Sequence, residues 1–177
     1  MAFTFVVEDG TIVANANSFV TVEDATAILE IDFRVGPVWA ALSEDDQQKS
    51  LVMATMYLED NWQWFGKRTG PLLDPPEEQP LKWPRTGMKD CEGNCIAANV
   101  IPTEVKRATA QLAMWLRNND GNEQLEAEGI KRFRSDEVEI EWQDGYAGRV
   151  APEFLSKLLK CFGYGPNDRG FKPIVRV

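Results

Sequence analysis

A long proline-rich segment, from about Gly66 to Val100, constrains the fold of this chain more than any other feature. It holds half of the ten prolines and centres on the run from Gln79 to Gly87, which reads Gln-Pro-Leu-Lys-Trp-Pro-Arg-Thr-Gly. Loops beyond about 12–15 residues without secondary structure are uncommon in compact domains and are usually functional or disordered. Because this one carries Leu81 and Trp83, we expect it to dock, either on its own domain or on a neighbouring copy.

Helix signals lie on both sides of this loop. Thr21 and Ser43 are good N-cap residues, and each is followed three positions later by an aspartate. Pro102 and Pro152 suit the first turn of a helix. Apolar residues at helical spacing follow each start, with Phe33 and either Thr55 or Met56 among the candidates for the buried faces. The expected helices cover about 22–35, 44–61, 102–120 and 152–162, and together they predict a small bundle.

Extended segments are expected at both ends of the chain and before the last helix. Asp9-Gly10 lies between two β-prone runs, which predicts a hairpin within an N-terminal arm, residues 1–16. Residues 130–134 and 138–142 are typical of strands, because Ile140 and Trp142 alternate with glutamates in the second. The tail, residues 164–177, contains two prolines and ends in apolar residues. It either packs on its own domain or adds as a strand to another sheet.

These elements predict a mainly α fold. It consists of about four helices with a β-hairpin or short strands, the inserted loop at 66–100 and extended terminal arms. One helical domain, residues 17–163, is expected between the arm at 1–16 and the tail at 164–177. A length of 177 residues is consistent with one such domain.

Several function classes are disfavoured by composition. The chain contains no histidine, which removes Ser-His-Asp and Cys-His catalysis and imidazole metal sites. The net charge of −9 opposes broad affinity for nucleic acid. No P-loop or dinucleotide-binding glycine pattern is present. We therefore expect no enzyme and no cofactor, although a carboxylate pair assembled from distant helices would escape a search of the sequence.

The three cysteines, Cys91, Cys95 and Cys161, are too few for a zinc site without histidine. No signal peptide and no membrane-spanning stretch is evident. These features predict a protein made in the cytoplasm with free thiols, or with occasional oxidation of Cys91 and Cys95, and with no bound metal.

One cluster in the sequence mixes aromatic and basic residues. Single-stranded nucleic acid is bound by aromatic stacking along a basic groove, and the alternative is that the tryptophans anchor the fold or an interface between subunits. The negative net charge favours the anchor interpretation. The cluster comprises Trp62, Trp64, Phe65, Lys67, Arg68, Lys82, Trp83 and Arg85.

Four blocks of the sequence stand out by their order and spacing. The first block is Asn-Ser-Phe-Val-Thr-Val-Glu-Asp-Ala at 17–25, and the second is the stretch 49–66, which ends in Trp-Phe-Gly. The third is Gln-Pro-Leu-Lys-Trp-Pro-Arg at 79–85, and the fourth runs from Ile101 to Ala113. Together they resemble the tailed-phage head–tail connector family, which also carries the label DnaT-like single-stranded-DNA-binding protein. The resemblance covers residues 17–116 well and the C-terminal part more loosely.

This resemblance implies a structural adaptor of the virion neck. Copies would form a ring, commonly dodecameric, below the portal protein and would contact a tail, nozzle or stopper protein. DNA would pass through the channel without sequence-specific binding, and no membrane is involved. The residues expected at interfaces are Trp64, Leu81, Trp83, Pro84, Arg85, Phe171, Ile174, Val175 and Val177.

The alternative function is a DnaT-like single-stranded-DNA-binding replication module. For this function the expected nucleic-acid contacts are Trp62, Lys67, Arg68 and Lys82.

Overall fold

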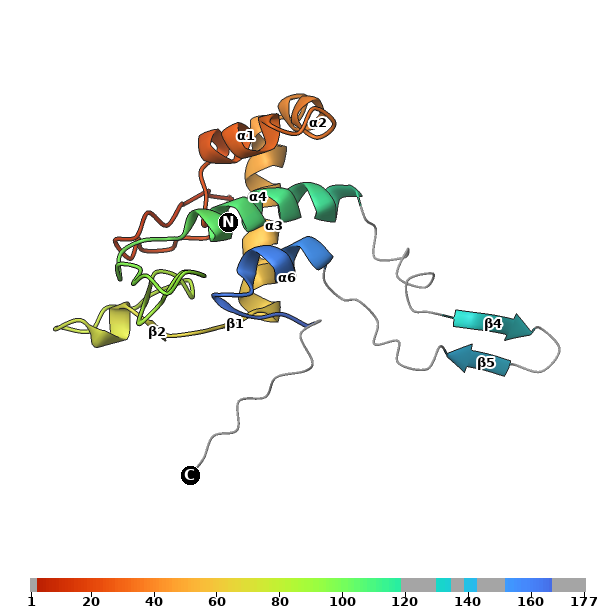
Figure 1. The fold of residues 1–177 in the computed structure, drawn as a ribbon. Helices are drawn as coiled ribbons and strands as arrows, with labels where there is room; N and C mark the ends of the chain where they lie inside the picture. Colours follow the sequence, from red (N-terminus) through yellow and green to blue (C-terminus); the bar gives the residue numbers. More distant parts are fainter. Residues whose placement is uncertain (1–2, 119–129, 135–138, 143–151, 167–177) are drawn as a thin grey trace.

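The computed structural model describes residues 3–118, 130–134, 139–142 and 152–166. The fold is mainly α, which confirms the predicted fold class (Figure 1). A long helix, α3, stands at the centre with the other helices arranged around it. The α-helices described are α1 (Val22–Glu30), α2 (Gly36–Ala40), α3 (Glu44–Asn61), α4 (Thr103–Asn118) and α6 (Glu153–Leu159).

The helix starts follow the predicted capping. The Thr21 hydroxyl accepts a hydrogen bond from the Asp24 N–H at 3.0 Å, and the Ser43 hydroxyl accepts one from the Asp46 N–H at 3.2 Å. The short helix α2 was not predicted. Gly36-Pro37 was expected to end a helix, but proline also fits the first turn, and here it opens a new one.

The core forms where α4 packs against α1, α3 and α6. Ala54 and Leu58 of α3, Leu112 of α4 and Leu155 of α6 are completely buried. In the middle of α3 the buried position belongs to Thr55, whereas Met56 points outward. None of the described helices has the length and hydropathy needed to cross a bilayer.

The described strands form three antiparallel pairs. The strands β1 (Gln63–Trp64) and β6 (Gly163–Tyr164) join the exit of α3 to the exit of α6. The strands β2 (Lys67–Arg68) and β3 (Arg85–Thr86) close the first part of the loop, which includes a 3₁₀ turn, η1 (Gly70–Leu72). The strands β4 (Ile130–Arg134) and β5 (Glu139–Trp142) confirm the strands predicted at 130–134 and 138–142, apart from Val138, which lies outside the described residues.

The N-terminal segment differs from the predicted hairpin. Its buried Glu8 carboxylate accepts hydrogen bonds from the N–H groups of Gly10, Ile12 and Val13 at 2.8–3.0 Å, which curls the chain around one side chain. Gly10 has φ +106°, and a Cβ there would lie 1.9 Å from the Asn99 carbonyl oxygen. From residue 3 onward the described part of this segment therefore packs on its own domain, against the end of the long loop.

Candidate functional surfaces

The long loop docks on its own chain through Trp83. This side chain is fully buried in an aromatic cluster, with ring centroids 5.6 Å from Trp64 and 6.2 Å from Phe162. Trp62 lies 6.2 Å from Trp64 and extends the cluster. The indole N–H groups of the three tryptophans are buried, and within the described residues they have no hydrogen-bond acceptor. Apolar packing and edge-to-face contacts therefore hold this cluster together.

Two buried polar side chains fix the loop backbone. Gln79 donates from Nε2 to the carbonyl oxygens of Leu81 and Pro84 at 2.9 and 2.8 Å, and its Oε1 accepts from the Gly70 N–H at 2.9 Å. Arg85 donates from its guanidinium to the carbonyl oxygens of Lys82 and Gly66, each at 2.9 Å, and also to that of Phe65. Burial is the main cause that lowers the pKa of Arg85. Both side chains thus satisfy carbonyl groups that the loop would otherwise bury unpaired.

The residues predicted at interfaces fall into two groups. Trp64, Leu81, Trp83, Pro84 and Arg85 are buried in their own chain, so in this structure the side chains are not on the surface. Of the two docking modes considered for the loop, docking on its own domain is the one observed. A contact of these residues with another chain stays a prediction. The second group, Phe171, Ile174, Val175 and Val177, lies outside the described residues.

The residues predicted to contact nucleic acid are also divided. Trp62 is buried, and Lys82 is held at the end of α3, where its N–H donates to Glu59 Oε1 at 2.9 Å and its Nζ to the Glu59 carbonyl oxygen. Burial raises the pKa of Glu59, and the charge of Lys82 opposes that shift. Only Lys67 and Arg68, both exposed on β2, present their charges freely to solvent.

An aromatic pair lies next to these two basic residues. The Phe65 side chain is 36% exposed and packs edge-to-face on Tyr164, with ring centroids 4.8 Å apart. The pairing of β1 with β6 brings the two rings together, and the Phe65 N–H donates to the Phe162 carbonyl oxygen at 2.8 Å. We call Phe65, Tyr164, Lys67 and Arg68 the Phe65 platform. The sequence suggested no role for Tyr164, because this contact spans about a hundred residues and has no local signal.

Among the described residues, the large apolar side chains with the highest exposed fractions lie elsewhere, between α1 and α2. Ile31 is 87% exposed and Phe33 is 83% exposed, and Val38 of α2 is also exposed. We call these three residues the α1–α2 corner. A second exposed apolar pair, Met53 and Met56, lies on α3. The helical periodicity had suggested buried positions for Phe33 and for either Thr55 or Met56, and the structure buries Thr55 and places Phe33 and Met56 on the surface.

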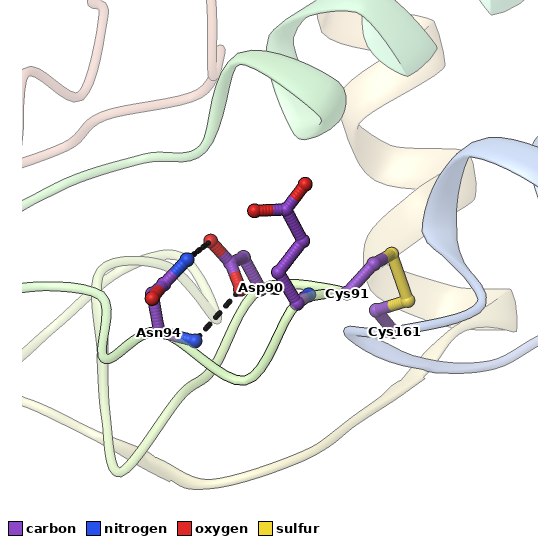
Figure 2. Close-up of a disulfide and its surroundings, with 5 residues drawn as sticks. Asp90, Cys91, Asn94 and Cys161 are labelled. Carbon is purple, nitrogen blue, oxygen red and sulfur yellow. Dashed lines mark hydrogen bonds between the residues drawn. A yellow bond between two sulfur atoms is a disulfide. The ribbon is translucent and has the colours of Figure 1, made fainter.

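A disulfide joins the long loop to the end of α6 (Figure 2). Cys91 and Cys161 are bonded with Cα atoms 5.2 Å apart, while Cys95 is free and exposed. Beside the bond, Asp90 accepts from the N–H and the side-chain amide of Asn94 at 2.8 and 2.9 Å. The prediction of free thiols was wrong for Cys91 and Cys161, because the fold brings together two cysteines that are 70 residues apart. Within the described part of the chain, no group of three or more acidic, cysteine or histidine side chains could hold a metal ion.

Comparison with protein families gives one match. Residues 3–177 match the model of a family described as "Putative DnaT-like ssDNA binding protein". The chain belongs to this family. No curated protein and no solved structure matches the chain. The DnaT-like part of the resemblance found in the sequence is therefore confirmed, whereas the match gives no support to its head–tail connector part.

Proposed function

We propose that this member of the DnaT-like family is a structural head–tail adaptor of a tailed phage. In this proposal the copies form a ring below the portal, link it to the tail and line the DNA channel. The observation that carries the proposal is the α1–α2 corner, where Ile31 and Phe33 are more than four-fifths exposed. Large exposed apolar patches mark protein–protein contact sites, and three exposed apolar side chains fall within residues 31–38 here.

The arrangement of the exposed apolar residues favours assembly into a ring. The α1–α2 corner and the exposed Met53–Met56 pair of α3 lie on different elements of one chain. When one surface binds a different surface on the next copy, the contact is heterologous and generates a ring if the rotation closes. The net charge of −9 supports a channel role, because a negative wall repels the DNA backbone and lets it slide.

The test is electron microscopy of the purified protein mixed with portal-containing heads that lack tails. A ring of added density at the portal vertex is expected with the wild type. The double variant Ile31→Ser/Phe33→Ser should fold normally and leave the vertex bare. The matched control is Leu72→Ser/Leu73→Ser, which removes two exposed apolar side chains from the η1 turn. Normal decoration of heads by the Ile31→Ser/Phe33→Ser variant would refute the proposal.

Single-stranded DNA binding is the second candidate, and the family description favours it. The tryptophans first considered for stacking are buried, so the surface that supports this function is the Phe65 platform. It combines a partly exposed aromatic pair with Lys67 and Arg68 on the adjacent strand. Stacking on an aromatic side chain contributes about 1–3 kcal/mol per base, and nearby cations hold the phosphates.

Fluorescence anisotropy of a labelled oligothymidine tests this candidate. Binding through the platform should weaken steeply with added salt and be lost in Lys67→Glu/Arg68→Glu. Lys157→Glu/Lys160→Glu makes the same change of net charge in the last turn of α6 and at its C-cap, and serves as the control. If the oligonucleotide does not bind at low salt, or binds both variants equally, the platform is not a DNA-binding site.

A further inference from the structure

The β4–β5 hairpin is paired only with itself among the described strands. A two-stranded hairpin on its own is at best marginally stable in water, and three strands or a packing partner are needed for independent stability. The strand β5 is paired with β4 along one edge, and no described strand lies on its other edge. Among the described residues this edge has no backbone partner, so its N–H and C=O groups can receive a further strand.

The register divides the hairpin into an apolar and a charged set of positions. Ile130 pairs with Trp142, and Phe133 pairs with Ile140. The alternate positions pair Arg132 with Glu141 and Arg134 with Glu139. Alternation along β5 therefore places Ile140 and Trp142 on one face and Glu139 and Glu141 on the other.

The C-terminal residues carry the complementary pattern. Phe171, Pro173, Val175 and Val177 alternate with Lys172, Ile174 and Arg176, and these residues lie outside the described part of the chain. In a parallel register, Val175 and Val177 of such a strand would lie beside Ile140 and Trp142, and Arg176 beside Glu141. Lys172 would then be level with Glu137, which lies outside the described residues. Opposite charges and apolar pairs at neighbouring positions stabilise adjacent strands.

Proline fixes which side of the tail faces β5. Proline has no N–H to give to a sheet, so it is tolerated in an edge strand when its nitrogen faces solvent. With Pro173 facing outward, the residues that pair with β5 are Lys172, Ile174 and Arg176. The N–H groups of Val175 and Val177 then face solvent.

We propose that residues 171–177 of one copy add to the free edge of β5 in a second copy as a third strand. The proposal rests on the self-association in the proposed function and names the segment and the edge that join the copies. The backbone hydrogen bonds supply affinity, and the alternating pattern sets the register.

A peptide experiment tests the pairing without any need for a ring. A fluorescein-labelled peptide of residues 167–177 is titrated with the protein truncated after Gly170. The wild-type peptide and its Val175→Pro version should bind, because the N–H of Val175 faces outward. The Ile174→Pro and Lys172→Glu/Arg176→Glu peptides should bind about tenfold more weakly, since the first loses a ladder hydrogen bond and the second reverses two charge pairs. Equal binding of the two proline peptides would overturn the proposal.

Disulfide crosslinking identifies the copy that supplies the strand. In a Cys95→Ser background, full-length chains with Glu141→Cys are mixed with chains with Arg176→Cys and oxidised. A crosslink between the two chains is expected, and none is expected with Glu44→Cys, which places the cysteine on the exposed first turn of α3. A crosslink formed only within a single chain carrying both Glu141→Cys and Arg176→Cys would overturn the exchange between copies.

The two proposals fail in different ways. If the wild type never joins portal-containing heads, but the peptide binds as predicted and the chains crosslink, the adaptor function is wrong and strand exchange stands. If the full-length Ile174→Pro variant decorates heads normally and Glu141→Cys and Arg176→Cys give no crosslink, strand exchange is wrong and the adaptor function stands.

Discussion

The long loop and the α1–α2 corner both carry large apolar side chains, yet the loop buries its central pair, Leu81 and Trp83, whereas the corner exposes all three of its own. Trp83 of the loop is completely buried, whereas Phe33 of the corner is 83% exposed. Each residue has an arginine close by in the sequence: Arg34 directly follows Phe33, and Arg85 is separated from Trp83 by Pro84. The amount of apolar surface in a segment therefore does not decide whether it anchors its own fold.

The polar groups around each segment explain the difference. Beside Trp83, the buried side chains of Gln79 and Arg85 donate hydrogen bonds to carbonyl oxygens of the loop. The loop backbone can therefore be buried with little loss of free energy, because its carbonyl groups keep hydrogen-bond partners. At the corner, Arg34 pairs with Asp32 on the surface and satisfies no buried carbonyl. The loop is therefore part of the folding unit, and the corner is available to another molecule.

The largest effect is expected for Trp83→Ala, which tests the loop as an anchor. Removing a fully buried tryptophan leaves a cavity beside Trp64 and Phe162, and we expect a loss of about 3–5 kcal/mol in the free energy of unfolding. Urea denaturation gives this value. Phe33→Ala at the corner should change the free energy by less than about 0.5 kcal/mol. Equal losses in the two variants would erase the contrast between the two regions.

Cys161→Ser should have the next largest effect, because the disulfide ties the loop to α6. The bond closes a separation of 70 residues, and loss of such a crosslink typically costs about 2–4 kcal/mol. Denaturation of the wild type with and without a reducing agent should show the same loss. Cys95→Ser removes the exposed free thiol and should leave stability unchanged. A wild type whose unfolding is insensitive to reduction would show that the bond adds nothing to the docking of the loop.

Local signals in the sequence predicted most of the fold. Caps at Thr21 and Ser43 set the starts of α1 and α3, and the alternation at Ile140 and Trp142 marked β5. The predictions failed where a local signal has two outcomes. Pro37 can follow a helix or open one, and the Asp9-Gly10 turn was overridden by the buried Glu8 carboxylate.

The candidate surfaces were harder to predict, because they depend on contacts between distant residues. The sequence marked Trp62, Trp64 and Trp83 as a group, but only the packing against Phe162 shows that they face inward. The partner of Phe65 is Tyr164, and the partner of Cys91 is Cys161. No spacing rule links such pairs, since the pairing of β1 with β6 brings Gly163 and Tyr164 back to the exit of α3.

A smaller loss is expected for Arg85→Met, which separates hydrogen bonding in the loop from apolar packing. Methionine retains much of the apolar volume but leaves the carbonyl groups of Lys82, Gly66 and Phe65 without their donor. Buried acceptors without partners cost about 1–3 kcal/mol. Arg85→Lys should fall between the wild type and Arg85→Met, because an ammonium group cannot reproduce the guanidinium fork. Arg34→Met at the corner is the control, and a loss there as large as that of Arg85→Met would contradict the assignment.

The smallest effect concerns Glu59, the partly buried carboxylate where the loop meets α3. Burial raises its pKa above the ordinary value of 4.5, so the folded state holds this proton more tightly than the unfolded state. The resulting contribution to stability is present below the unfolded pKa and is lost as the pH rises through the folded pKa. Glutamine stays neutral at every pH, so Glu59→Gln lacks this pH dependence. The free energy of unfolding of the wild type should therefore fall relative to that of Glu59→Gln between about pH 4 and the raised pKa of Glu59. Above that pKa the difference between the two proteins should stay constant. Urea denaturation of both proteins across this range measures it. Lys82→Met removes a charge that lowers the pKa of Glu59, so in that background the loss of stability should continue to higher pH. If the difference in stability between wild type and Glu59→Gln does not vary with pH, the base of the loop is as solvated as the α1–α2 corner.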